Sequence, residues 1–277
     1  MSQFRFIMSP FTTGLVPSPP PPPLSPPPSS SKSTATPIRV AVIVGINYVG
    51  SPFQLNGCIH DARHIREMLI SKFHFPPQNI TMLCDPSIPG SMRPTRINIL
   101  RAILSAVSAT NSHPQSELWI YYSGHGSQVI DTNGDENDGM DEVIVPIPDE
   151  RGVCNPIIDD ELFTLVSRSL CPTVVLVDSC HSGSMCDLQY ETSFDKENLV
   201  ERKVRPGKTI QNPHIVSISG CSDHQTSMDT YSRRLGKHVG AFTDAFIQSL
   251  DACKYKGDIM DIYRDTCTRL EKAEYSQ

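Results

Sequence analysis

Short apolar runs alternate with longer amphipathic stretches along most of this chain, and this alternation limits its possible folds more than any other feature. The first run, IRVAVIVGIN at 38–47, is nearly continuous and β-branched, as in a strand that is buried on both faces. Further runs that we interpret as strands lie at 80–84, 118–122, 143–147, 174–177 and 214–219. Stretches with helical spacing lie at 58–73, 95–107, 159–166 and 241–250. Strands that alternate with helices predict an α/β fold, with a mostly parallel sheet sandwiched between helices.

Polar residues at the starts of these helical stretches are candidate helix caps. We expect Asn56 and Thr95 to cap the first two helices, and Asp159 or Asp160 to begin the third.

The first 37 residues differ in composition from the rest of the chain. Residues 10–37 contain eleven of the 24 prolines, interleaved with serine. Such a segment buries too little apolar surface to offset its chain entropy, so we predict that 1–37 is disordered or polyproline II. It is either a plain tether or a ligand for an SH3-type or WW-type partner. A single globular domain is expected over 38–277.

Charge, hydropathy and cysteine usage exclude several classes of protein. The net charge of −6 over 277 residues leaves no basic stripe for nucleic acid. No apolar stretch approaches the roughly 18 residues that cross a bilayer, and Ser, Pro and Thr interrupt the N-terminus where a signal peptide would be apolar. Nine cysteines without a CxxC pair support neither a disulfide framework nor a zinc ribbon. We therefore expect a cytoplasmic protein with reduced cysteines and no membrane association.

Two predicted strands end on reactive side chains. LWIYY at 118–122 leads into Ser-Gly-His125-Gly, and VVLV at 174–177 leads into Asp-Ser-Cys180-His-Ser-Gly. The carboxyl ends of parallel strands meet at one edge of a sheet, where ligands bind. An imidazole there can deprotonate a thiol and later protonate a leaving amine. His125 and Cys180 are therefore predicted to form a catalytic dyad.

Other assignments for this cysteine are less consistent with the sequence. His181 is the rival base, but adjacent residues at a strand end point in different directions. A tyrosine-phosphatase loop needs an arginine six residues after the cysteine, where this chain has Cys186. A serine-hydrolase elbow needs flanking glycines that Ser179 and Ser182 lack.

Four motifs together resemble the metacaspases, which are caspase-like cysteine peptidases. They are YYSGHGS at 121–127, DSCHSG at 178–183, GCIHDA at 57–62 and SGCSDHQTS at 219–227. The resemblance covers about 39–250, and the histidine precedes the cysteine by a caspase-like interval. The short segment after 183 and the Pro-rich leader are similar to type I members.

The resemblance also implies subdivisions of the globular domain. A large-subunit-like part would span 38–189, a processing loop 190–212 and a small-subunit-like part 213–277. The family usually continues through another short strand after a Ser-Gln similar to the one that ends this sequence at Gln277.

Acidic residues near the predicted dyad indicate which peptide bond is cut. Asp61, Ser123 and Asp178 all fall at the ends of elements, where carboxylates would bind a guanidinium or ammonium group. Alternatively, Asp61 is only a helix N-terminal carboxylate stabilised by the macrodipole. The resemblance implies cleavage after Arg or Lys, with an S1 pocket at Cys58, Asp61, Ser123 and Asp178. His60 stands where the family more often has Asn.

The backbone N–H groups of Gly126 and Cys180 are the expected oxyanion donors.

The acidic stretch DTNGDENDGMDE at 131–142 is similar to an EF-hand loop in its spacing. However, Glu136 occupies the position that requires glycine, and a strand rather than a helix follows. We therefore reject an EF-hand in favour of a solvated acidic loop.

Calcium is expected at a different place. Four aspartates match those that bind calcium in many metacaspases: Asp141, Asp159, Asp160 and Asp187. Ca²⁺ there would order the segment after Cys180 and so couple calcium to activity. Alternatively, Asp159 and Asp160 act only as helix N-caps. No organic cofactor is expected.

The expected processing loop is rich in basic residues, and we interpret its basic cluster ERKVR at 201–205 as a solvated, flexible loop. Its candidate self-cleavage positions are Lys196, Arg202, Lys203, Arg205 and Lys208. Exposed basic residues near an Arg/Lys-specific site predict self-cleavage, with calcium as its trigger.

The sequence thus predicts a monomeric, calcium-activated cysteine endopeptidase that acts on protein or peptide substrates after Arg or Lys. One alternative is a non-catalytic caspase-like scaffold that binds partners or aggregates through the Pro-rich arm, which would not need His125 and Cys180. The other is a legumain-type peptidase that cuts after Asn, which Asp61 and Asp178 do not suit.

Overall fold

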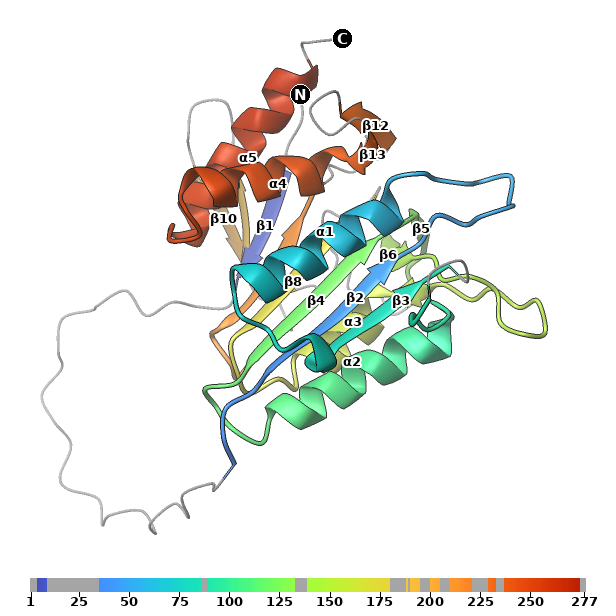
Figure 1. Cartoon of the computed structure of the whole chain (residues 1–277), viewed down its shortest axis with the longest axis horizontal. Helices are drawn as coiled ribbons and strands as arrows, with labels where there is room; N and C mark the ends of the chain where they lie inside the picture. Colours follow the sequence, from blue (N-terminus) through green and yellow to red (C-terminus); the bar gives the residue numbers. More distant parts are fainter. Residues whose placement is uncertain are drawn as a thin grey trace, which may run out of the picture.

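The computed structural model describes residues 4–8, 35–85, 89–132, 139–179, 188, 190–194, 200–204, 210–220, 229–232 and 237–274. Its centre is an eight-stranded sheet with five adjacent parallel strands (Figure 1). The strands in spatial order are β10 (Val200–Val204), β9 (Tyr190–Phe194), β1 (Phe4–Met8), β11 (Ile215–Ser219), β8 (Thr173–Asp178), β4 (Glu117–Ser123), β2 (Arg39–Gly45) and β3 (Ile80–Cys84). The predicted α/β fold with a mostly parallel sheet is confirmed.

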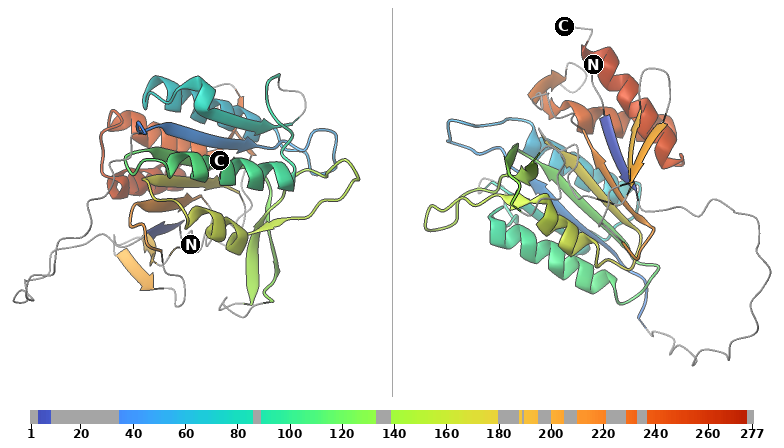
Figure 2. Two further views of the ribbon diagram at one scale, coloured as in Figure 1. Left: turned by 90° about the horizontal axis from the view of Figure 1, so that it is seen from below. Right: turned by 180° about the vertical axis from the view of Figure 1, so that it is seen from behind.

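Helices cover both faces of this sheet (Figures 1 and 2). One face carries α1 (Cys58–Ser71), α4 (Ala241–Ala252) and α5 (Ile259–Glu274). The other carries α2 (Arg96–Thr110) and α3 (Asp159–Val166). A single 3-10 turn, η1 (Pro77–Asn79), leads into β3 within the described residues. The sheet is therefore the middle of three layers.

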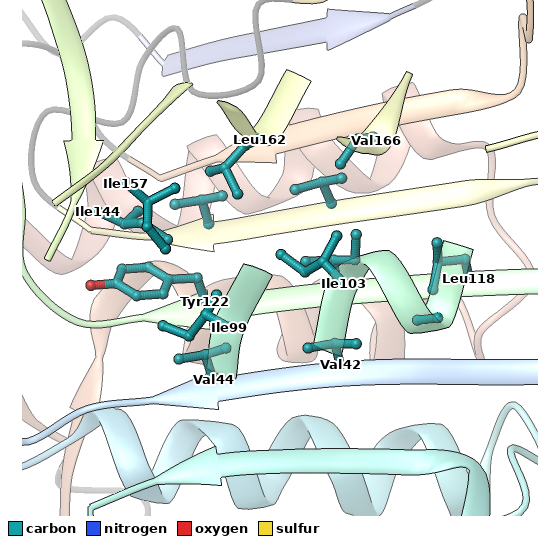
Figure 3. Packing of buried hydrophobic residues seen from close by; sticks show 14 of the residues in the cluster. Val42, Val44, Ile99, Ile103, Leu118, Tyr122, Ile144, Ile157, Leu162 and Val166 are labelled. Carbon is teal, nitrogen blue, oxygen red and sulfur yellow. The ribbon is translucent and has the colours of Figure 1, made fainter. Parts of the chain in front are cut away.

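Alternating side chains of the central strands supply the two cores. On β2, Val42 and Val44 belong to the core beneath α2 and α3, whereas Ala41 and Ile43 belong to the core beneath α1, α4 and α5. Figure 3 shows the first of these cores, in which aliphatic side chains of α2 and α3 pack on β2 and β4. Such continuous apolar strands need helices on both sides, because both faces are removed from water.

Two smaller sheets flank the main one. The first joins β5 (Gly126–Ile130), β6 (Met140–Ile144) and β7 (Ile157–Ile158), and the second joins β12 (Asp229–Ser232) and β13 (Lys237–Gly240). The strand that we predicted at 143–147 therefore begins earlier and ends at Ile144. Pro146 explains the difference, because proline cannot donate to a sheet ladder. The acidic stretch 131–142 follows β5 and ends within β6, so a strand and not a helix follows it, as predicted; residues 133–138 lie outside the described residues.

The sequence also failed to predict several elements. Strand β1 lies within the 1–37 segment predicted to be disordered; its sequence FRFIM contains no proline and can add a strand to the sheet. Residues 9–34, which hold most of the prolines, lie outside the described residues. Strands β9 and β10 lie within the segment predicted to be a loop, and they pair with each other in antiparallel fashion. Helix α5 was not predicted.

The helix caps also differ in part from expectation. Helix α1 has Gly57, not Asn56, at its N-cap, whereas Thr95 is the N-cap of α2 as predicted. Helix α3 begins at Asp159, so Asp159 and Asp160 lie in its first turn and not at the cap, which is Ile158.

Candidate active site

The ends of three parallel strands bring the candidate residues together at one edge of the sheet. The register pairs Gly45 of β2 with Ser123 of β4, and Ser123 with Asp178 of β8. Because the strands are parallel and in register, the residues that follow them leave the sheet at the same edge. This edge is where the sequence places His125 and the Asp-Ser-Cys motif.

His125 follows β4 and is half-buried. Its backbone N–H donates to the Tyr48 hydroxyl at 2.9 Å, and its ring centroid lies 4.6 Å from that of Tyr48. Its Nε2 lies 2.7 Å from the carbonyl oxygen of Phe53. A carbonyl can only accept a hydrogen bond, so Nε2 must carry the proton and Nδ1 holds the lone pair in the neutral ring. The imidazole is thus oriented with its basic nitrogen directed away from Phe53.

Cys180 lies outside the described residues, as does Asp187. Ser179, which precedes Cys180, is buried at 1% exposure. Gly126, one of the two predicted oxyanion donors, is the first residue of β5 and is opposite Ile144 in the register. The structure therefore fixes the histidine half of the predicted dyad.

Two of the predicted pocket residues are buried carboxylates from different elements. Asp61 in the first turn of α1 is 1% exposed, and Asp178 at the end of β8 is 4% exposed. The backbone N–H of Gly240 donates to Asp61 Oδ2 at 2.7 Å. Thr243 donates to Asp178 Oδ2 from its N–H at 3.0 Å and from its hydroxyl at 2.6 Å. Both carboxylates therefore meet the N-terminus of α4, whose dipole favours negative charge.

Gly240 lies between the two carboxylates. A Cβ at this position would lie 2.2 Å from Asp178 Oδ2 and 2.9 Å from Asp61 Oδ2, so the two oxygens are within about 5 Å of each other. Any larger residue would displace at least one of them. The structure thus brings Asp61 and Asp178 together as the sequence predicted, with a glycine that lets them approach.

Of the remaining predicted pocket residues, Ser123 lies beside this pair. Ser123 is 2% exposed and is the register partner of Asp178. The buried Tyr121 hydroxyl lies 2.8 Å from Thr243 Oγ1; burial, followed by the charges of Asp61 and Asp178, raises its pKa well above the usual value. Cys58, 8% exposed, begins α1. The pocket is therefore electronegative.

Sequence reasoning missed Gly240, Thr243 and Tyr121 as parts of this pocket. The helix at 241–250 had been predicted, and its N-terminus is a place where carboxylates bind. Nothing local in the sequence shows that this particular N-terminus packs on β8.

The predicted calcium ligands lie at a second acidic location. Asp141 on β6 is 5% exposed, and Asp159 at the start of α3 is fully buried. Strand β6 pairs with β7, which leads directly into α3, so Asp141 and the first turn of α3 lie in neighbouring elements. Asp159 Oδ1 accepts a hydrogen bond from the Asp160 N–H at 2.8 Å. Among the described residues, no three His, Cys, Asp or Glu side chains form a group that could hold a metal ion.

Of the candidate self-cleavage residues, Arg202 and Lys203 lie on β10, the edge strand. Lys196, Arg205 and Lys208 lie outside the described residues. The interpretation of 201–205 as a flexible loop is wrong for 201–204, which pair with β9.

The sheet order, the two helical layers and the polar edge define a caspase-like α/β protein. The architecture matches that of caspase-1 from Spodoptera frugiperda with a TM-score of 0.50 over 90% of this chain and 84% of that chain, at 9% identity. A crystal structure of a Geobacter sulfurreducens protein matches with a TM-score of 0.58 over 84% of this chain and 89% of that chain, at 26% identity.

The sequence comparisons assign the family. The family model described as metacaspase, peptidase C14 domain, matches residues 39–189. The chain is 39% identical to metacaspase-1 of Saccharomyces cerevisiae over 78% of this chain and 60% of the relative. It is 36% identical to metacaspase-2 of Arabidopsis thaliana over 76% of this chain and 51% of the relative. The chain therefore belongs to the metacaspase family.

The chain spans about half to two thirds of the length of these curated relatives. In the part of the chain that the structure describes, no helix has the length and apolar character needed to cross a bilayer. The six described cysteines are all free thiols: Cys58, Cys84, Cys154, Cys171, Cys253 and Cys267.

Proposed function

We propose that this chain is a cysteine endopeptidase that cleaves peptide bonds after Arg or Lys with Cys180 and His125. Membership of a peptidase family supports the reaction class. The observation that carries the specificity is the convergence of two buried carboxylates, Asp61 and Asp178, over Gly240 at the edge of the sheet that holds His125. Two carboxylates in a low-dielectric site favour a guanidinium or ammonium group and disfavour an acidic side chain.

The chemistry follows from the orientation of His125. Nδ1 takes the proton of the Cys180 thiol, and the thiolate attacks the carbonyl carbon of the substrate's Arg or Lys residue. The N–H groups of Gly126 and Cys180 donate to the oxyanion. The imidazolium then protonates the leaving amine as the C–N bond breaks. Water, deprotonated by the same imidazole, hydrolyses the thioester and restores the thiol.

Phe53 contributes through its backbone. Its carbonyl oxygen accepts from Nε2–H and stabilises the positive charge that His125 carries after it takes the thiol proton.

We also propose that calcium activates the enzyme through Asp141, Asp159, Asp160 and Asp187. Hard oxygen ligands suit Ca²⁺, and burial of Asp141 and Asp159 makes a cation at this location favourable. The described residues supply only part of a coordination shell. When bound, calcium would supply positive charge that offsets repulsion among these carboxylates. Asp159 is held by its contact with the Asp160 N–H, which orients one oxygen.

Self-processing at Arg202 or Lys203 is a further part of the proposal. β10 is separated from β8 by four strand positions, or about 19 Å at ~4.8 Å per strand. A strand in the sheet cannot enter the active site of its own molecule at that distance, so processing there requires release of β10 or cleavage by a second molecule. An edge strand pairs on one side only, which makes its release easier.

Three remaining proposals concern the location of the enzyme, its oligomeric state and its Pro-rich segment. We propose a cytoplasmic monomer, and we propose that the Pro-rich segment is a tether or a ligand for an SH3-type or WW-type partner.

The test uses fluorogenic peptides that end in Arg, Lys, Asp or Asn, each with calcium or with a chelator. Cys180→Ala is the inactive variant, and Cys154→Ala is the matched control because Cys154 is the exposed cysteine among those that the structure describes. We expect calcium-stimulated cleavage after Arg and Lys that Cys180→Ala abolishes and Cys154→Ala retains. Cleavage after Asn or Asp alone would contradict the assigned specificity. A folded protein that cleaves none of the four peptides would favour the scaffold alternative.

A further inference from the structure

Tyr48 has an unusual backbone conformation next to the candidate active site. Its φ is 53°, in the left-handed region that a bulky residue seldom adopts. The flanking N–H groups of Asn47 and Val49 donate to the buried carboxylate of Asp85 at 3.2 and 3.1 Å. Asp85 directly follows β3, so the sheet itself anchors the turn that carries Tyr48. Because the fold holds this strained conformation in place, we expect the Tyr48 side chain to have a specific role at this position.

The Tyr48 side chain reaches the backbone of His125. Its hydroxyl accepts from the His125 N–H at 2.9 Å and donates to the Val145 carbonyl at 2.6 Å. Its ring packs against the imidazole at 4.6 Å between centroids. One residue therefore contacts both the main chain and the ring of His125.

Tyr122 binds the other backbone group of the same residue. Its hydroxyl donates to the His125 carbonyl oxygen at 2.7 Å and accepts from the Val145 N–H at 3.2 Å. Figure 3 shows the Tyr122 ring at the border of the core, with its hydroxyl directed away from the aliphatic side chains. The two tyrosine hydroxyls lie 3.1 Å apart. Both backbone groups of His125 are thus bound by this hydroxyl pair.

Gly124 makes this arrangement possible. A Cβ at position 124 would lie 2.6 Å from the Tyr122 hydroxyl and 2.9 Å from the Tyr48 hydroxyl. The glycine before the histidine therefore lets both phenols approach the main chain. Burial raises the pKa of both phenols, so they remain neutral and able to donate.

We infer that Tyr48 and Tyr122 are positioning residues that set the orientation of His125 in the catalytic reaction. The inference rests on the proposed function of His125 as the base for Cys180. The hydroxyl pair binds the N–H and the carbonyl oxygen of His125, and so fixes the two peptide units that flank its Cα, while the Phe53 carbonyl binds Nε2 at the far end of the side chain. Because the N–H, the carbonyl oxygen and Nε2 of His125 are all hydrogen-bonded, the imidazole has little rotational freedom. Nδ1 therefore keeps a fixed orientation. The alternative is that these phenols serve only the core, to which both belong.

The experiment compares Tyr48→Phe and Tyr122→Phe with Tyr255→Phe. Tyr255→Phe deletes a hydroxyl that donates to Asp251 on the helical layer, so it is the matched control for loss of a hydrogen-bonded phenol. His125→Ala gives the effect of losing the base altogether. Two readouts are measured on the full chain well below each variant's unfolding midpoint. One is kcat and KM on Arg peptides, and the other is the pH dependence of Cys180 alkylation by iodoacetamide, followed by mass spectrometry.

We expect Tyr48→Phe and Tyr122→Phe to lower kcat by about 10- to 100-fold with KM changed by less than about twofold. Alkylation of Cys180 near neutral pH should slow toward the rate of His125→Ala, because a misdirected Nδ1 no longer stabilises the thiolate. Tyr255→Phe should leave both readouts at the wild-type value.

The failures of the two proposals are distinguishable. If the wild-type chain cleaves no peptide but the two variants still shift Cys180 alkylation, the proposed function is wrong and the positioning role stands. If Tyr48→Phe and Tyr122→Phe both match Tyr255→Phe in the rate of Cys180 alkylation and in kcat, the inference is overturned. A lower unfolding midpoint with unchanged alkylation would also overturn it, because the phenols would then serve only the core.

Discussion

Two groups of buried carboxylates differ in how the fold holds them. Asp61 and Asp178, the pocket carboxylates, accept hydrogen bonds from Gly240 and Thr243, which lie 179 and 65 positions away in the sequence. Asp159, in contrast, accepts from the next residue, Asp160, within the first turn of α3. The first arrangement exists only when α1, β8 and α4 have packed together, whereas the second forms with a single helix.

The difference shows that negative charge alone does not make a pocket. The pocket carboxylates are fixed by donors from a distant helix, so their oxygens keep a defined separation for a planar cation. Near α3, Asp141 and Asp159 are buried carboxylates, which suits an ion that itself supplies positive charge. Substitutions in the two groups should therefore affect different properties.

The largest effect is expected for Asp178→Asn. The amide keeps the shape of the side chain and can still accept from Thr243, but it removes one of the two charges that face the substrate's guanidinium. Loss of one partner in a buried charge pair costs about 4 kcal/mol, or roughly 1000-fold in kcat/KM on Arg peptides. Asp261→Asn, the same change at an exposed aspartate of α5 outside both groups, is the control, and both variants are measured with saturating calcium. Activity of Asp178→Asn within about threefold of wild type would contradict the assignment of the pocket.

A smaller loss is expected for Gly240→Ala. The added methyl group would overlap Asp178 Oδ2 and push the pocket carboxylates apart. We expect kcat/KM on Arg peptides to fall about 100-fold, the effect of a displacement of about 1 Å. Gly152→Ala controls for loss of a glycine without a steric contact: a Cβ there meets nothing within 4 Å, and its cost is only the backbone strain of alanine at a φ of 77°. Equal activity in the two variants would show that the approach of the carboxylates is unimportant.

Asp159→Asn should change the response to calcium and leave peptide recognition intact. Removal of one charged ligand should raise the calcium concentration for half-maximal activation by about tenfold. Asp261→Asn, an exposed aspartate on α5, is the control. Titration of activity with calcium measures the effect. An unchanged titration curve would remove Asp159 from the proposed calcium site.

The smallest effect is expected at the ion pair that joins α2 and α3, the two helices on one face of the sheet. Glu161 of α3 accepts from Arg96 of α2 at 2.7 Å, and this contact lowers the pKa of Glu161. Glu161→Gln should lower the free energy of unfolding by about 1 kcal/mol at neutral pH, a value already reduced for partial exposure.

The pH dependence of that effect has a definite sign. Because the folded-state pKa of Glu161 is depressed, its contribution is complete above the unfolded pKa of about 4.3 and disappears as the pH falls through the folded value. Denaturant unfolding of Glu161→Gln and wild type should therefore converge in acid. Glu117→Gln, which breaks the more exposed pair with Arg39, should destabilise less. A constant difference between pH 7 and acid would contradict the role of the charge.

The comparison of the two groups also explains how much the sequence could predict. Strands such as 38–47 and 118–122 were recognisable because both faces are buried, and His125 was recognisable because its Gly-Ser context ends a strand. Asp61 and Asp178 were found by their position at element ends. Gly240 and Thr243 were not, because their contact with β8 depends on packing across the sheet.

The missed elements have similar physical reasons. Helix α5 buries Tyr263, Cys267 and Leu270 at helical spacing, so a pattern was present although charged residues separate its members. Strand β1 inserts between β9 and β11, two strands that follow it by well over a hundred residues, and its sequence contains no sign of those partners.

The central claim is that Asp61 and Asp178 bind the side chain that precedes the cleaved bond. The most direct measurement is a crystal structure of Cys180→Ala with a bound peptide that contains Arg at that position. We expect the guanidinium to lie within hydrogen-bond distance of both carboxylates, beside Ser123. A peptide bound with its guanidinium in solvent or at another surface, and with Asp61 and Asp178 contacting only the protein, would contradict it.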